Sequence, residues 1–236
     1  MAIAATAALV GAMGSALVLS ATGSVQLSDR AAIEKIVREY ILANPEILPE
    51  AMENLRAKEL GKVVAANRAA IETPIGDAWE GAADADVTLV EFYDYACGYC
   101  RASLRDIDRL LAEDKKLKVV YRDMPVLGED SLEAARLSVA AALAGKFRAM
   151  HKPLYAAGRP TPEVVEATRK RLGLDAKALR APDVDRELAR NLNLQRQLDL
   201  SGTPAWVVGD KVLVGAIGYE GLKAAIAEAR AKSGAN

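Results

Sequence analysis

The sequence from residue 87 to residue 100 reads VTLVEFYDYACGYC, and it decides how the chain folds around its two cysteines. Residues 87–93 are mostly β-branched or aromatic, which is typical of a buried strand. After Cys100, apolar residues recur at helical spacing as far as Leu111, which predicts an amphipathic helix beginning near the cysteines. The sequence therefore places Cys97 and Cys100 at a strand-to-helix junction.

A cysteine at a helix N-terminus faces unpaired backbone N–H groups and the positive end of the helix dipole. Both favour the thiolate, and thiols in such CxxC motifs have pKa values lowered from about 8.5 toward roughly 3.5 to 7.5. We therefore predict that Cys97 is the attacking sulfur, nearer the solvent. Cys100, one helical turn on and facing inward, is predicted to resolve the mixed disulfide by intramolecular attack.

Cysteines with this spacing also occur as half of a zinc site or as a structural disulfide. Tetrahedral zinc needs four Cys or His ligands, and beyond the pair this chain has only His151. A bridge across so short a loop removes little entropy from the unfolded chain. We therefore predict a redox-active pair, with no metal site formed by one chain and no cofactor.

The composition predicts one folded domain with an appendage. The chain has 236 residues, of which 51% are hydrophobic, enough to bury a full core. The formal net charge is −1, and no basic run is interleaved with aromatic residues, which argues against nucleic acid as a partner. Protein thiols are the better candidates.

The N-terminal residues 1–23 are predicted to be a signal peptide. Residues 3–19 carry no charge, and Ala21-Thr22-Gly23 gives a small-x-small pattern for cleavage after Gly23. No Lys or Arg precedes Arg30, so the usual basic start is missing, and an uncleaved membrane anchor is the alternative. We expect export to the periplasm, where disulfides persist, so a lone CxxC pair indicates exchange rather than bracing.

Residues 24–75 are predicted to be a helical region followed by a linker. Apolar residues at steps of three and four indicate helix from about Ser28 to Arg68, with a break at Asn44-Pro45. Such an apolar stripe either folds back on the main domain or pairs with copies of itself. Thr73-Pro74-Ile75-Gly76-Asp77 indicates the linker.

Residues 76–236 are predicted to form an α/β domain with a mixed sheet. A second strand at 117–122 makes a parallel βαβ unit, and no strand signal occurs between about 130 and 200. Further elements are predicted in chain order as helices at 134–147, 163–172 and 184–198, strands at 205–208 and 212–214, and a helix at 219–231.

This order of elements, with CxxC after the first strand and Gly202-Thr203-Pro204 before the later hairpin, resembles the thioredoxin superfamily. The inserted helices make the chain similar to the DsbA family. The resemblance implies a thioredoxin-like fold with an inserted helical subdomain, preceded by an N-terminal helical segment. It also implies a cis bond before Pro204, with Thr203 facing the active-site sulfurs and both residues contacting the substrate.

The resemblance also implies roles for residues near the cysteines. Glu91 resembles the acidic residue buried under the dithiol in DsbA-like proteins, where it would assist proton transfer with Cys100; a solvent-facing carboxylate is the alternative. Gly98 and Tyr99 match the pair found in DsbC-like isomerases, and we expect them to contact substrate. Residues 28–59 resemble ScsC-like and Com1-like proteins, in which this region can mediate oligomerisation.

Together these features predict an exported thiol-disulfide oxidoreductase, an isomerase or reductase rather than a dedicated oxidant. Its expected partners are client proteins with thiols or disulfides, a membrane redox partner, and copies of itself. A periplasmic copper-binding or metal-tolerance protein that holds soft Cu(I) on the two thiolates is the leading alternative. A purely oligomeric binding module is a weaker one.

Two further residues are predicted to have structural roles only. His151 is expected to be partly exposed at a helix end, because the thiolate does not need it. Trp206 follows the Thr-Pro turn within an apolar β-rich run, which favours packing in the core.

Overall fold

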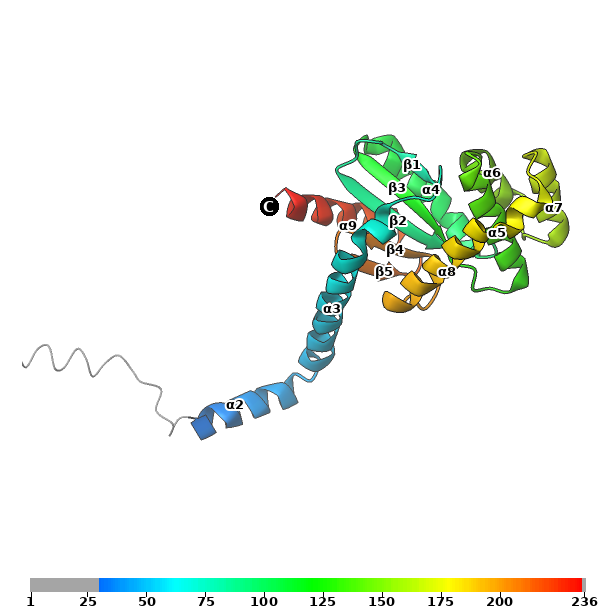
Figure 1. Cartoon of the computed structure of the whole chain (residues 1–236). Coiled ribbons are helices and arrows are strands. Elements are labelled where there is room, and N and C mark those ends of the chain that lie inside the picture. The colour runs from blue at the N-terminus through cyan, green and yellow to red at the C-terminus, as the bar shows by residue number, and fades with distance from the viewer. Residues whose placement is uncertain (1–29, 235–236) are drawn as a thin grey trace, which may run out of the picture. The chain divides into compact units, whose positions relative to one another are not determined.

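The computed structural model describes residues 30–234 (Figure 1). These residues divide into two compact units, one ending at Asn54 and the other beginning at Leu55. The predicted signal peptide lies outside the described residues. Among the helices of residues 30–234, none is both long enough and apolar enough to cross a lipid bilayer.

The two N-terminal helices meet at Asn44 and Pro45, where the sequence predicts a break. They are α2 (Arg30–Ala43) and α3 (Ile47–Glu72). The backbone N–H and the side-chain amide of Asn44 both donate to the carbonyl oxygen of Tyr40 at 2.9 Å, satisfying a carbonyl at the end of α2. Pro45 disfavours helix in the residue before it. The predicted break is confirmed, and α3 continues past its predicted end at Arg68.

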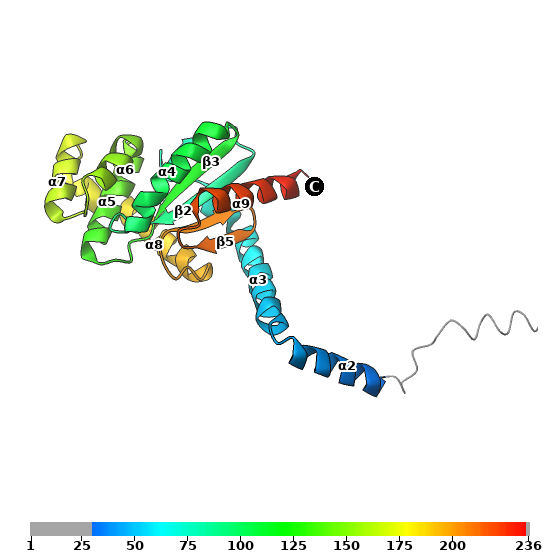
Figure 2. The same ribbon diagram turned by 180° about the vertical axis from the view of Figure 1, so that it is seen from behind.

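The second unit, residues 55–234, contains a five-stranded sheet with strand order β1-β3-β2-β4-β5 (Figures 1 and 2). Its strands are β1 (Trp79–Gly81), β2 (Val87–Tyr93), β3 (Leu117–Asp123), β4 (Ala205–Val208) and β5 (Lys211–Val214). β2 and β3 are parallel, and the other neighbours are antiparallel. The mixed sheet is confirmed. β1 was not predicted, because three residues that include Glu80 and Gly81 carry little strand signal.

Helices connect and cover the strands as the predicted order requires. α4 (Gly98–Glu113) joins β2 to β3, and α9 (Gly218–Ser233) ends the chain. The insert consists of α5 (Glu129–Leu143), α6 (Phe147–Ala156), α7 (Pro162–Arg171), the short 3-10 helix η2 (Ala176–Arg180) and α8 (Pro182–Gln197). The predicted single helix over 134–147 is wrong. Gly145 has a φ of +67°, which ends the first helix, and a new helix starts at Phe147.

The two faces of β2 enter two different apolar cores. Leu89 and Tyr93 pack in the core that contains side chains of α4, α5, α6 and α9, whereas Val90 and Phe92 pack in the core with α3 and α8. Burial on both faces explains why β2 reads as a continuous apolar run. Trp206 of β4 is fully buried, so its predicted core role is confirmed.

Arg122 of β3 fixes the C-terminal end of α3 to the sheet. Its buried guanidinium pairs with Glu187 of α8. It also donates hydrogen bonds to the backbone carbonyls of Ala70, Ile71 and Thr73. The first two carbonyls belong to the last turn of α3 and the third follows it, a place where backbone acceptors lack helical partners. One side chain therefore satisfies the helix end and joins it to β3 and α8.

Candidate active site

Cys97 lies at the N-cap of α4, as predicted. Its φ and ψ of −80° and 117° are extended, and Gly98 is the first helical residue. The backbone N–H of Cys100 donates a hydrogen bond to the Cys97 Sγ at 3.4 Å. The sulfur thus accepts a hydrogen bond from one of the free N–H groups of the helix start, an arrangement that favours negative charge on an N-cap atom.

Cys100 is the more deeply buried of the two free thiols. It is 0% exposed, whereas Cys97 is 6% exposed. Burial raises the pKa of the Cys100 thiol strongly, and the nearby carboxyl of Glu91 raises it further. Within residues 30–234, no group of three or more His, Cys, Asp or Glu side chains is arranged to hold a metal ion.

The Thr203-Pro204 turn lies against Cys97, although it is remote in the sequence. The Cys97 thiol donates to the carbonyl oxygen of Thr203 at 3.4 Å. The bond between Thr203 and Pro204 is cis, as the resemblance implies. The Pro204 carbonyl accepts a hydrogen bond from the N–H of Gly215 at 2.8 Å, which ties the turn to the end of β5. The structure therefore brings the two predicted motifs together.

Glu91 is buried beneath the dithiol rather than facing solvent. In β2 it lies opposite Tyr121 on one side and Trp206 on the other. It is 1% exposed, and its Oε1 atom has no hydrogen-bond partner among the described residues. Burial raises its pKa well above the usual value, and the charge of Cys97 raises it further. The charge of Cys97 thus affects the protonation of Glu91, and both groups raise the pKa of the Cys100 thiol.

Gly98 and Tyr99 lie between the cysteines on the surface. A Cβ atom at Gly98 would meet no other atom within 4 Å, so the position opens outward. Tyr99 is 69% exposed. Its phenol, two positions after Cys97 in the sequence, is a large amphipathic surface with little protein packed against it.

His151 is not partly exposed, as predicted from the sequence, but fully buried. Its Nδ1 lies 2.9 Å from the hydroxyl of Tyr95, and its ring stacks on Phe147 with centroids 4.7 Å apart. Burial, with a smaller effect of Lys152, lowers its pKa to about 3, so the ring is neutral at physiological pH. The error arose because α6 turns this helix face toward β2, an orientation that depends on tertiary packing.

A second buried acid, Asp123, is the last residue of β3 and lies near Tyr93, one of the aromatic residues around His151. Burial raises its pKa to about 8, although hydrogen bonds from Tyr93 and Ser138 oppose the shift. Tyr93 and Ser138 are themselves joined, with hydroxyl oxygens 2.9 Å apart. Sequence reasoning missed this acid, because a carboxylate after a strand is commonly solvated.

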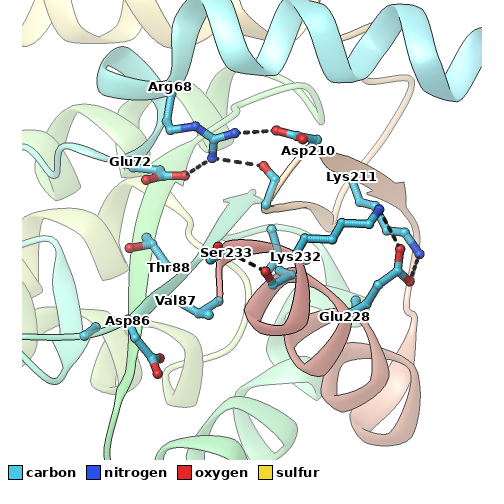
Figure 3. A pocket seen from close by; sticks show the side chains of 15 residues that line it. Arg68, Glu72, Asp86, Val87, Thr88, Asp210, Lys211, Glu228, Lys232 and Ser233 are labelled. Carbon is cyan, nitrogen blue, oxygen red and sulfur yellow. Dashed lines mark hydrogen bonds and ion pairs between the residues drawn. The ribbon is translucent and has the colours of Figure 1, made fainter. Parts of the chain in front are cut away.

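A separate polar hollow of about 440 Å³ lies at the opposite end of β2 from Cys97, lined by α3, β2, the β4–β5 turn and α9 (Figure 3). Its ion pairs join Arg68 to Glu72 and Asp210, and Glu228 to Lys211 and Lys232. These charges largely neutralise one another. Because the hollow lies at the start of β2 and Cys97 follows the end of β2, the hollow is not part of the thiol site.

Three solved structures are similar to this chain over most of their own length. A thioredoxin-like oxidoreductase from Silicibacter pomeroyi DSS-3 is 34% identical, with 70% of this chain and 98% of that chain covered and a TM-score of 0.65. A linker-deletion mutant of Proteus mirabilis ScsC is 27% identical (90% and 100% covered, TM-score 0.68). The thiol-disulfide exchange protein α-DsbA2 from Wolbachia pipientis is 26% identical (74% and 97% covered, TM-score 0.64).

Among curated proteins, the chain is 30% identical over 163 residues to Na(+)/H(+) antiporter NhaA 1 of Salinispora arenicola, with 66% of this chain covered. The chain spans about a quarter of the length of that relative.

Models of two protein families match different regions of the chain. Residues 29–59 match the copper resistance protein ScsC N-terminal domain. Residues 88–227, more than half of the chain, match the DSBA-like thioredoxin domain, and the chain belongs to this family of thiol-disulfide oxidoreductases.

Proposed function

We propose that this protein is an exported thiol-disulfide oxidoreductase that reduces or isomerises disulfides in client proteins. The environment of the Cys97 sulfur carries the proposal. This atom accepts the N–H of Cys100 at the start of α4 and lies 3.4 Å from the Thr203 carbonyl oxygen. A sulfur held at the start of a helix beside a second thiol is the arrangement that disulfide exchange needs.

In the proposed reaction, the Cys97 thiolate attacks one sulfur of a client disulfide. The client S–S bond breaks, one client sulfur leaves as a thiolate, and the other is joined to Cys97. The Cys100 thiolate then attacks the Cys97 sulfur, so the second client sulfur leaves and a Cys97–Cys100 disulfide remains. The client gains two electrons and the enzyme loses two. In isomerisation, another client thiolate attacks the mixed disulfide instead, and the enzyme is returned reduced.

Glu91 is proposed to accept the proton of Cys100 during resolution. While Cys97 is a thiolate, its charge helps to keep Glu91 protonated. Capture of Cys97 in a mixed disulfide removes that charge, so Glu91 loses its proton to water more readily. The resulting carboxylate can then take the proton of Cys100, whose thiol is otherwise hard to ionise.

Thr203, Pro204, Gly98 and Tyr99 are proposed to contact the client. A segment beside Thr203 and Pro204 could pair with their backbone in the manner of strand addition. The exposed ring of Tyr99, two positions after Cys97, offers a further apolar contact. No cofactor takes part in this exchange.

The N-terminal helices are proposed to assemble several copies of the chain in the periplasm. The apolar side chains of α2 are exposed, Ile33, Ile36, Val37 and Tyr40 among them. The match of residues 29–59 to the ScsC N-terminal domain supports this role. Several dithiols on one assembly raise the effective concentration at a second client disulfide, which would favour isomerisation. A membrane redox partner would restore the dithiol.

Copper binding is the second candidate, because the family matched by residues 29–59 is described as a copper resistance protein. Two thiolates are suitable ligands for Cu(I). In that case Cys97 and Cys100 would bind the metal together, and neither would form a lasting bond to a client sulfur.

Trapping with Cys100→Ala tests the proposed exchange against the copper alternative. The variant is expected to accumulate a mixed disulfide between Cys97 and a client protein that was reduced and then reoxidised with non-native disulfides. On a non-reducing gel this adduct appears as a larger band that disappears when a reductant is added. Cys97→Ser is the matched control and should trap nothing. If Cys100→Ala forms no adduct while the wild type binds Cu(I), the oxidoreductase proposal is wrong for this chain.

A further inference from the structure

Asp94 is a buried acid whose carboxylate joins two loops beside the dithiol. It follows β2 directly and is 2% exposed. Its Oδ1 accepts a hydrogen bond from the N–H of Ala96 at 2.8 Å. Its Oδ2 accepts two more, from the N–H groups of Val126 at 2.9 Å and Leu127 at 3.0 Å. One side chain therefore holds the CxxC loop and the β3–α5 loop together.

The backbone of Asp94 is part of the same junction. Its carbonyl oxygen accepts the N–H of Cys97 at 3.0 Å and the hydroxyl of Tyr155, from α6, at 3.1 Å. A hydrogen bond from the Asp94 backbone also favours the thiolate of Cys100, against the larger effect of burial on the pKa of that thiol. A change in how Asp94 is held would therefore reach both cysteines.

The β3–α5 loop, residues 124–128, presents apolar side chains next to this junction. Val126 is 42% exposed and Leu127 is 51% exposed. Their N–H groups bond to Asp94, which fixes the backbone of the loop while both side chains remain accessible. The loop begins at Met124, whose N–H donates to the carbonyl of Tyr93 at 2.7 Å. The β3–α5 loop and the loop that carries Cys97 therefore follow the carboxyl ends of the two parallel strands, β3 and β2, at the same end of the sheet.

We propose that Asp94 is a positioning residue that holds Val126 and Leu127 as an apolar contact for client residues flanking the attacked cysteine. This inference rests on the proposed function and adds a substrate preference to it. The favoured client is an extended segment with large aliphatic or aromatic side chains beside its cysteine, as misfolded proteins expose.

A carboxylate suits this position because all of its hydrogen-bond partners here are N–H donors. An asparagine has one oxygen and one NH₂ group. In either orientation its NH₂ would face backbone N–H groups, either that of Ala96 or those of Val126 and Leu127. The loop would then lose its fixed place, although the side chain at position 94 keeps its size.

The test compares two peptide disulfides that carry the same leaving group, one with leucine and phenylalanine beside its cysteine and the other with serine and glycine. The wild type is expected to prefer the apolar peptide. Leu127→Ser should lower kcat/KM for that peptide roughly tenfold, through KM, because it removes most of one buried aliphatic contact. Leu143→Ser, at the far end of α5 and similarly exposed, is the matched control and should keep the wild-type preference.

Asp94→Asn should abolish the same preference, and the Asp94→Asn, Leu127→Ser double variant should lose little more than either single variant. Amide hydrogen exchange at Val126 and Leu127 should speed up in Asp94→Asn. Unchanged preference in Leu127→Ser, or fully additive losses in the double variant, would overturn the inference. Absence of exchange with either peptide in the wild type would instead refute the proposed function.

Discussion

The Sγ atom of Cys97 lies 3.4 Å from the carbonyl oxygen of Thr203, and 106 residues of sequence separate the two. The sulfur therefore lies between two backbone groups, this carbonyl and the N–H of Cys100. The helix N–H stabilises a thiolate, whereas the carbonyl accepts the proton of the neutral thiol. Cys100 is fully buried, and burial together with the Glu91 carboxyl raises the pKa of its thiol.

This asymmetry predicts that iodoacetamide modifies Cys97 on the order of 100-fold faster than Cys100 in the reduced native protein at neutral pH. The reason is that Cys100 is fully buried and its thiol resists ionisation. Peptide mass spectrometry over a time course gives the two rates. In guanidinium chloride the two cysteines should react at similar rates. Comparable labelling in the native state would contradict the asymmetry.

The active-site motifs could be predicted because their signals are local. The apolar strand before Cys97 and the helical periodicity after Cys100 fix the junction, and the Thr203-Pro204 pair needs only its position before a hairpin. Periodicity alone does not predict the burial of Glu91, since a single acid in an apolar strand does not reveal which face of the strand is covered.

The remaining features depend on partners that are distant in the sequence. Asp94 accepts N–H groups from residues more than thirty positions away, and Arg122 meets the end of α3 about fifty positions before it. His151 is buried only because α6 packs over the aromatic residues of the sheet. No periodicity within one segment contains this information.

The raised pKa of Asp123, about 8, predicts a pH dependence of stability. Between about pH 4, where the unfolded chain loses this proton, and about pH 8, the native state still binds it. The contribution of Asp123 to the free energy of unfolding therefore falls as pH rises, by up to about 1.4 kcal/mol per pH unit. Above about pH 8 it becomes constant.

Asp123→Asn removes this contribution, so its free energy of unfolding relative to wild type should increase between about pH 4 and about pH 8. Guanidinium unfolding at several pH values measures the difference. Asp84→Asn is the control, because Lys116 lowers the pKa of this exposed acid, and its difference should be flat over the same window. A flat difference for Asp123→Asn would show that this carboxyl is ionised throughout.

Arg122→Ala is predicted to lower the free energy of unfolding by about 3–5 kcal/mol, because the buried Glu187 would keep only the exposed Arg190, 3.7 Å away, as a cationic partner. Adding Glu187→Leu removes this poorly compensated buried charge and should restore part of the loss. Recovery should be incomplete, since the carbonyls of Ala70, Ile71 and Thr73 still lose their donor. Urea denaturation of the three variants checks the order. Full recovery in the double variant would mean that these carbonyls find other donors.

The exposed apolar face of α2 predicts how the proposed assembly could be broken. Ile36 and Tyr40 lie four positions apart on this helix and are both exposed. Replacing both by glutamate should make association unfavourable, because charged side chains would have to be buried. Light scattering should then give the mass of a single chain, and refolding of a scrambled-disulfide client should slow. Exchange with a small disulfide should be retained, since the residues proposed for the thiol site all lie outside α2.

Lys35→Glu is the matched control for this variant. Lys35 is exposed on the same helix, where its ammonium group is 3.9 Å from the Glu39 carboxylate, and an exposed pair of this kind contributes little to stability. The control changes the charge of α2 without entering the apolar face, so mass and refolding rate should match wild type. If Ile36→Glu, Tyr40→Glu leaves the mass in solution unchanged, α2 does not carry the assembly. A lower mass with unimpaired client refolding would instead separate assembly from isomerisation.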